Sequence, residues 1–164
     1  AINHAKEKNS KLHILGLLSD GGVHSHINHI FALINMAKEH GIKDLYIHVF
    51  LDGRDVTYNS AKIYLDKLKE YLKDTNDNII IGYEPNYTFK EKQIPTKEHI
   101  EEIVTLIKNI TKRKYNKEIK VLYGGNVSKE NIKILEQIKN LDGYLIGRKA
   151  INIKDIKEIF DEME

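Results

Sequence analysis

Glycine, charged residues or both gather in five short segments, each of which directly follows an apolar run. The segments are residues 19–26, 52–55, 84–85, 124–126 and 147–149. Glycine lets the backbone approach a ligand closely, and a helix that begins just beyond supplies free N–H groups for an anion. Because the carboxyl ends of parallel strands share one edge of a sheet, the pattern predicts a site there for a small phosphorylated or carboxylated ligand.

Each segment also has a simpler explanation. A glycine pair after a strand is often only a tight turn, and residues 52–55 could form a turn closed by an internal ion pair. Glu84 could be a solvated carboxylate at the end of a strand. His24, His26 and His29 are two and five positions apart, and such positions do not share one helix face, so a three-histidine metal site is not favoured. Spacing alone indicates an α/β domain that binds an anion.

The elements that must position these segments alternate along the chain. Short, nearly continuous apolar runs are typical of strands buried on both faces, and five are present, at residues 12–18, 45–51, 78–83, 119–123 and 143–146. A helical pattern follows each run, with Thr96 and Ser128 as expected N-caps. The order predicts βα units and a parallel sheet. An eightfold barrel needs about 250 residues, so we expect about five strands, as a partial TIM-type barrel or an open doubly wound sheet.

Composition narrows the class of protein. The chain has 164 residues, a net charge of +2 and no cysteine, so disulfides and thiolate metal sites are excluded. Basic and acidic residues are interspersed, which argues against a nucleic-acid partner, and no apolar run is long enough to span a membrane. We expect one compact cytoplasmic domain. An open sheet would leave edges that favour a homo-oligomer.

The first half of the chain carries two specific strings, GLLSDGGVHSHINH at residues 16–29 and YIHVFLDGRD at residues 46–55. Over about residues 1–73 it resembles cofactor-independent phosphoglycerate mutase. The resemblance implies that His24, Arg54 and Asp55 contact phosphoglycerate. Segments carrying that family's phosphorylated serine and paired manganese ligands have no counterpart here. No metal ligand is therefore expected in this chain, and manganese would bind only if another chain supplied those segments.

From about residue 78 onward the chain is similar to the C-terminal part of triosephosphate isomerase. The strings IGYEP, VLYGGNV and DGYLIG, at residues 81–85, 121–127 and 142–147, carry this resemblance. It implies that Glu84 is the enolisation base and that two loops hold phosphate, through Gly124, Gly125, Asn126, Gly147 and Arg148. Asn126 replaces a serine and Arg148 a glycine, and the lid at residues 86–93 lacks glycine. That family's lysine and electrophilic histidine have no counterpart.

The two resemblances together predict a chimaera, with a mutase-like segment at residues 1–74 and an isomerase-like segment at residues 75–164. We expect His24, Arg54, Glu84, Gly125 and Arg148 along one sheet edge, facing a small phosphorylated three-carbon substrate. The predicted function is a glycolytic isomerase-class activity with Glu84 as base, in an incomplete chain that is weak or inactive by itself. The alternatives are a mutase-like fragment that binds substrate and a phosphate-binding module without catalysis.

Overall fold

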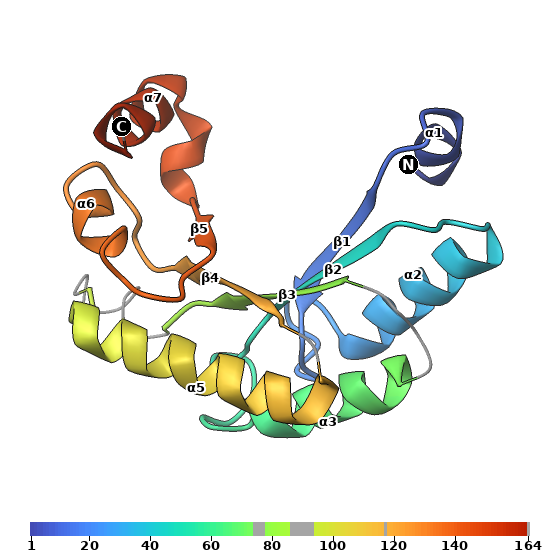
Figure 1. Cartoon of the computed structure of the whole chain (residues 1–164). Helices are drawn as coiled ribbons and strands as arrows, with labels where there is room; N and C mark the ends of the chain where they lie inside the picture. Colours follow the sequence, from blue (N-terminus) through green and yellow to red (C-terminus); the bar gives the residue numbers. More distant parts are fainter. Residues whose placement is uncertain (74–77, 86–93, 117, 164) are drawn as a thin grey trace. The chain divides into compact units, whose positions relative to one another are not determined.

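The computed structural model describes residues 1–73, 78–85, 94–116 and 118–163. It divides into two compact units, Ala1–Ile81 and Gly82–Glu164. Strands and helices alternate, and the strands form a five-stranded sheet in the order β1-β2-β3-β4-β5 (Figure 1). The pairs β1–β2 and β4–β5 are parallel. The α/β class with a parallel sheet of five strands is confirmed, and the sheet is open because β1 and β5 end the order.

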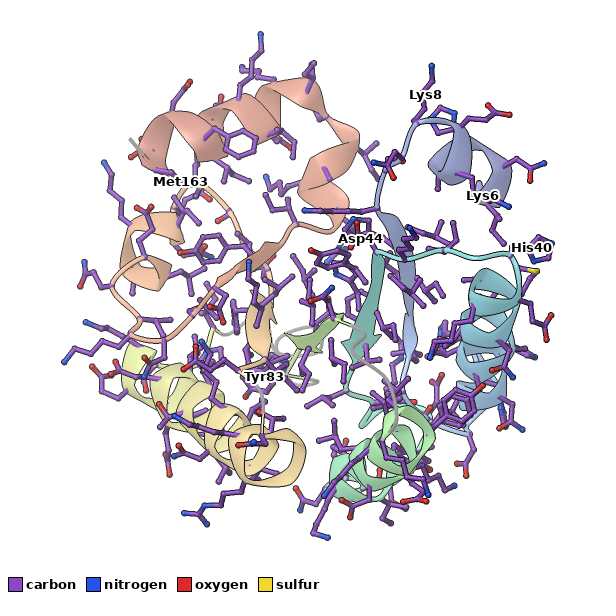
Figure 2. The ribbon with its side chains drawn as sticks, turned by 45° about the vertical axis from the view of Figure 1, so that its right-hand side comes forward. Lys6, Lys8, His40, Asp44, Tyr83 and Met163 are labelled. Atoms are coloured by element: carbon purple, nitrogen blue, oxygen red, sulfur yellow. The ribbon has the colours of Figure 1, made fainter. Side chains whose placement is uncertain are left out.

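The first unit begins with a short helix that the apolar pattern did not predict, α1 (Ile2–Glu7). The elements that follow are β1 (Leu12–Leu17), α2 (Ile27–Glu39), β2 (Leu45–Phe50), α3 (Ala61–Leu72) and β3 (Asn78–Tyr83). β1 and β2 pair in register from Leu12 opposite Leu45 to Leu17 opposite Phe50. Both strand exits therefore lie at the same level. β3 crosses the boundary between the units, and Figure 2 labels its last residue, Tyr83.

The second unit contains α5 (Lys97–Tyr115), β4 (Lys120–Gly124), α6 (Ile132–Leu135) and β5 (Gly143–Leu145), followed by η1 (Arg148–Ile151) and α7 (Ile153–Met163). The strand bounds agree with the apolar runs to within a residue. The apolar spacing of Ile132, Leu135 and Ile138 predicts a helix after β4 that reaches Ile138, but α6 already ends at Leu135. Residues 74–77 and the lid expected at residues 86–93 lie outside the described residues.

The helix starts show one correct prediction and one wrong one. Thr96 caps α5, and its hydroxyl oxygen accepts from the His99 N–H at 3.3 Å. Ser128 is not an N-cap, because α6 begins only after Asn131. Residues 128–131 form a turn in which the Ser128 carbonyl accepts from the Asn131 N–H and the Asn131 side chain accepts from the Ser128 N–H. The turn satisfies its own polar groups and delays the helix.

The core of the first unit lies between β1, β2 and one face of α2. The buried residues of α2 recur at three- and four-residue spacing, which is a single helical stripe: Ile27, Ile30, Ile34 and Ala37. Along β2 burial alternates, with Leu45, Ile47 and Val49 buried and the residues between them half-buried. Two-sided burial is therefore wrong for these strands, and Leu15 of β1 is 60% exposed. The second face of β1 and β2 remains partly open to solvent.

Because the core lies on one face of β1 and β2, substitutions on the two faces should differ in their effect on stability. Leu45→Ala should lower the free energy of unfolding by about 2–5 kcal/mol, because Leu45 is buried and truncation leaves a cavity. Leu15→Ala on the open face is the matched control and should cost less than about 1 kcal/mol. Urea denaturation followed by circular dichroism measures both. Equal losses would show that both faces are covered in solution.

Candidate functional site

The exits of β1 and β2 are joined by the carboxylate of Asp52. The Ser19 hydroxyl donates to Asp52 Oδ2 at 2.5 Å, and both residues are buried. Asp52 Oδ1 accepts from the backbone N–H groups of Arg54, at 2.9 Å, and Asp55, at 3.0 Å. The turn at residues 52–55 is therefore closed by backbone donors that point at an aspartate side chain, as in an Asx turn.

These contacts decide the charge of Asp52. Burial raises the pKa of its carboxyl, but the hydrogen bonds from Ser19 and from the N–H groups of Asp55 and Arg54 oppose this and leave the pKa lowered. Hydrogen bonds to the charged form of a carboxyl favour that form. Asp52 is thus a buried carboxylate that stays ionised at neutral pH.

His24 and Asp55 lie in direct contact. His24 Nδ1 is 2.6 Å from Asp55 Oδ2; the His24 side chain is 51% exposed and the Asp55 side chain 5%. Gly21 makes this approach possible, because a Cβ on it would come within 2.7 Å of the Asp55 Cβ. Arg54 is exposed beside Asp55 in the same turn. The first unit therefore brings together the three residues predicted to contact phosphoglycerate.

The loop that carries His24 is also tied to α3. The Tyr64 hydroxyl donates to the Asp20 carboxylate, and Lys67 Nζ lies 3.5 Å from Asp20. The hydrogen bond from Tyr64 is the main cause that lowers the Asp20 pKa, and Lys67 adds to it. The site residues predicted from sequence do not include Ser19, Asp52, Asp20 or Tyr64. An aspartate that opens a glycine-containing turn could have identified Asp52.

The remaining histidines of this segment have structural contacts. His26 is the N-cap of α2, and its Nδ1 accepts from the Asn28 N–H at 3.1 Å. The His26 and His29 rings are tilted, with centroids 5.8 Å apart. Within the described residues, three or more histidine, aspartate or glutamate side chains nowhere gather as a metal-binding group.

The second unit brings Glu84, which follows β3, against the end of β4. A Cβ on Gly124 would lie 2.6 Å from Glu84 Oε1, so the Glu84 side chain in this position would have to shift if that residue were not glycine. Desolvation raises the pKa of the Glu84 carboxyl, although the residue still reaches solvent. The buried Tyr123 hydroxyl donates to the Gly125 carbonyl at 3.3 Å. A carboxyl whose pKa is raised by desolvation keeps its proton to a higher pH than a free glutamate does, and such shifts are common at functional sites.

The other predicted phosphate-binding residues lie on the β4 and β5 exits of this unit. Asn126 has a left-handed backbone with φ of 56°, and its carbonyl accepts from the Asn131 side chain at 2.9 Å. Gly147 and Arg148 are exposed at the start of η1. Phosphate binding at Gly124, Gly125, Asn126, Gly147 and Arg148 stays a prediction. So does the edge shared by His24, Arg54, Glu84, Gly125 and Arg148, because these residues belong to separate units.

Comparison with known proteins identifies the class to which this site belongs. The family described as BPG-independent PGAM N-terminus matches residues 1–83, more than half of the chain, and the chain belongs to this family. The 2,3-bisphosphoglycerate-independent phosphoglycerate mutases of Listeria welshimeri serovar 6b, Listeria monocytogenes serotype 4b and Listeria innocua serovar 6a are each 58% identical over 76 residues. The aligned part is 46% of this chain and 15% of each relative.

These matches confirm the mutase resemblance of the first segment and extend it to residue 83. The triosephosphate isomerase resemblance lies almost wholly beyond the matched residues, so it and the chimaera stay predictions. Among the described residues, no helix is long and apolar enough to cross a membrane.

The Asp52 contacts predict a pH-dependent stability. Asp52→Asn should cost roughly 1–3 kcal/mol at neutral pH, because it weakens the acceptor of one buried and two part-buried hydrogen bonds. The folded pKa is lowered, so the contribution of the ionised carboxylate is complete above the ordinary value of 3.8 and is lost as the pH falls through the folded pKa.

Urea denaturation at neutral pH and at about pH 3 measures this difference. The gap between wild type and Asp52→Asn should shrink on acidification. Asp44→Asn, at an exposed position just before β2 (Figure 2), is the control and should show little gap at either pH. A gap that stays constant from neutral to acidic pH would contradict the assignment to the ionised Asp52.

Proposed function

We propose that residues 1–83 form a phosphoglycerate-binding segment of a 2,3-bisphosphoglycerate-independent phosphoglycerate mutase. The contact between His24 and Asp55, on a turn held by Asp52 and next to an exposed Arg54, is the observation that carries the proposal. Because the chain spans only 15% of the mutases that it matches, binding of a three-carbon phosphate without turnover is the proposed activity of this chain alone. A glycolytic role would place it in the cytoplasm.

The geometry gives each group a task. Asp55 contacts His24 Nδ1 and thereby fixes the ring, so that Nε2 is directed away from the pair and can donate to a ligand oxyanion when the ring is protonated. The exposed guanidinium of Arg54 presents a planar fork that matches a phosphate or carboxylate. Hydroxyl groups of a glycerate would donate to the carboxylate of Asp55.

Manganese does not enter this proposal. In the described part of the chain, the oxygen and nitrogen donors do not form a group of three or more that could hold a metal ion. The residues present therefore do not fit the paired manganese site that the family resemblance implies. Another chain would have to supply the ligands, as a homo-oligomer or as a complementary polypeptide.

Binding is tested by calorimetric titration of the full chain with 3-phosphoglycerate. Arg54→Ala should weaken binding by about 1.5–3 kcal/mol, the scale for a charged hydrogen-bond partner. Arg113→Ala removes the same charge from an exposed position on α5 and is the matched control. Equal affinities of the two variants would count against Arg54 as a ligand, and loss of binding in both would indicate only a general charge effect.

We propose a triosephosphate-isomerase-like role for the second unit as the second candidate. The observation that favours it is the Glu84 carboxyl against Gly124, with a pKa raised by desolvation. A base with a raised pKa can take the proton next to a carbonyl. A chimaera of two glycolytic segments would follow from this role. If no group stabilises the oxyanion that forms when Glu84 removes a proton, the second unit would bind phosphate without catalysis.

Isomerase activity of the full chain should be near background. The enediolate oxygen needs a preorganised donor or cation, and losing one typically costs about 10²–10³ in rate. Turnover of dihydroxyacetone phosphate by wild type and Glu84→Gln, on protein freed of host enzyme, measures this. Any residual activity should vanish in Glu84→Gln. Turnover within about tenfold of a complete isomerase would mean that the chain supplies the missing groups.

A further inference from the structure

The face of β1 and β2 that turns away from α2 carries two histidines. Side chains alternate between the faces of a strand, and Ile14 and Gly16 lie on the α2 side, where Gly16 approaches Ile30. His13 therefore lies on the other face. The register sets His13 opposite Tyr46 and Leu15 opposite His48, which makes the two histidines diagonal neighbours across the strands.

The two imidazoles point at one another. His13 Nδ1 lies 2.8 Å from His48 Nε2, and the ring centroids are 5.1 Å apart. The His13 ring also stacks on Tyr46, with a centroid distance of 4.9 Å and an interplanar angle of 16°, and Lys11 Nζ lies 5.2 Å from the centroid of the same tyrosine. Strand pairing and stacking thus hold both nitrogens in place before any ligand arrives.

At least one of these rings must be neutral. Two facing ring nitrogens at this distance can share one proton, but if both carried one they would repel. A neutral imidazole nitrogen with a free lone pair is the commonest metal ligand in proteins. Without the shared proton, two ring nitrogens 2.8 Å apart both offer a lone pair on the same side of the sheet, and a metal ion beside the pair could bind both.

We propose that His13 and His48 form a two-imidazole site for a divalent transition-metal ion such as Zn²⁺, Ni²⁺ or Cu²⁺, with water completing the coordination. Nitrogens bound to one tetrahedral zinc ion at 2.0–2.1 Å are roughly 3.3 Å apart. To reach this geometry the nitrogens must separate by about 0.5 Å and the rings must turn so that their lone pairs converge on the ion, a rearrangement that the exposed His13 side chain can make. The site is separate from the phosphoglycerate-binding residues and does not depend on the proposed function.

The other histidines of the first unit are less suitable as metal ligands. His24 Nδ1 is engaged by Asp55, His26 Nδ1 caps α2, and His40 Nδ1 lies 2.8 Å from the Met36 carbonyl. The His26–His29 pair is the nearest rival, but its rings are further apart than those of His13 and His48. His29→Ala is therefore the matched control for the His13–His48 pair.

Calorimetric titration of the full chain with zinc chloride, in a buffer that does not chelate, tests the proposal. About one zinc ion per chain should bind, and His13→Ala and His48→Gln should each weaken binding by at least about tenfold. Binding should persist in His29→Ala. Magnesium should not compete, since it prefers oxygen ligands. Absence of saturable zinc binding, or loss in His29→Ala with full retention in His13→Ala, would overturn the proposal.

Copper gives a second measurement that does not depend on affinity. The electron paramagnetic resonance spectrum of the Cu²⁺-loaded chain should show hyperfine coupling to the nitrogens of two imidazoles, and this pattern should be lost in either variant. Far-ultraviolet circular dichroism establishes that each variant is folded. A spectrum with one coupled nitrogen in wild type, or one that His13→Ala and His48→Gln leave unchanged, would show that the pair does not chelate the ion.

Discussion

The mutase-like half of the chain depends on a buried carboxylate that joins two strand exits. Asp52 follows β2 and accepts from Ser19, which follows β1. The Asp52 carboxylate also accepts hydrogen bonds from the backbone N–H groups of Arg54 and Asp55. A buried charge is costly unless its hydrogen bonds are satisfied, and here three donors satisfy it. The turn that carries Arg54 and Asp55, the residues proposed to bind a ligand, is therefore held by the donors that satisfy the Asp52 carboxylate.

Further contacts connect the Asp52 turn to the loop after β1 and to α3. Gly21 lets the β1 loop approach Asp55, and the contact between His24 and Asp55 closes the arrangement. Asp20 connects the same loop to Tyr64 on α3. Each of these contacts joins residues that are far apart in sequence, so the site is a product of the sheet and not of any one motif.

Several features of the structure could be predicted from sequence because a local pattern determines them. Strand positions follow from the apolar runs, and Thr96 caps α5 because a threonine before a helical pattern has a hydroxyl acceptor at the right place. Other features have no local signature. A continuous apolar run does not tell whether a strand is covered on one face or two, and so the exposure of Leu15 was not foreseen. Ser128 was misassigned because the turn with Asn131 competes with a helix start. The turn closed by Asp52 has a local signature, but its contact with Ser19 depends on strand pairing, which residue spacing does not encode.

The separation of Ser19 and Asp52 along the chain links ligand binding to folding. These residues are 33 positions apart, and they meet only after β1 and β2 have paired in register. Closing such a loop costs entropy before the contact forms, so partly folded chains lack the site altogether. A ligand that needs both strand exits binds the folded unit and not the unfolded chain, and its binding free energy is added to the stability of the fold. The concentration of such a ligand would then help to determine how much of this segment is folded.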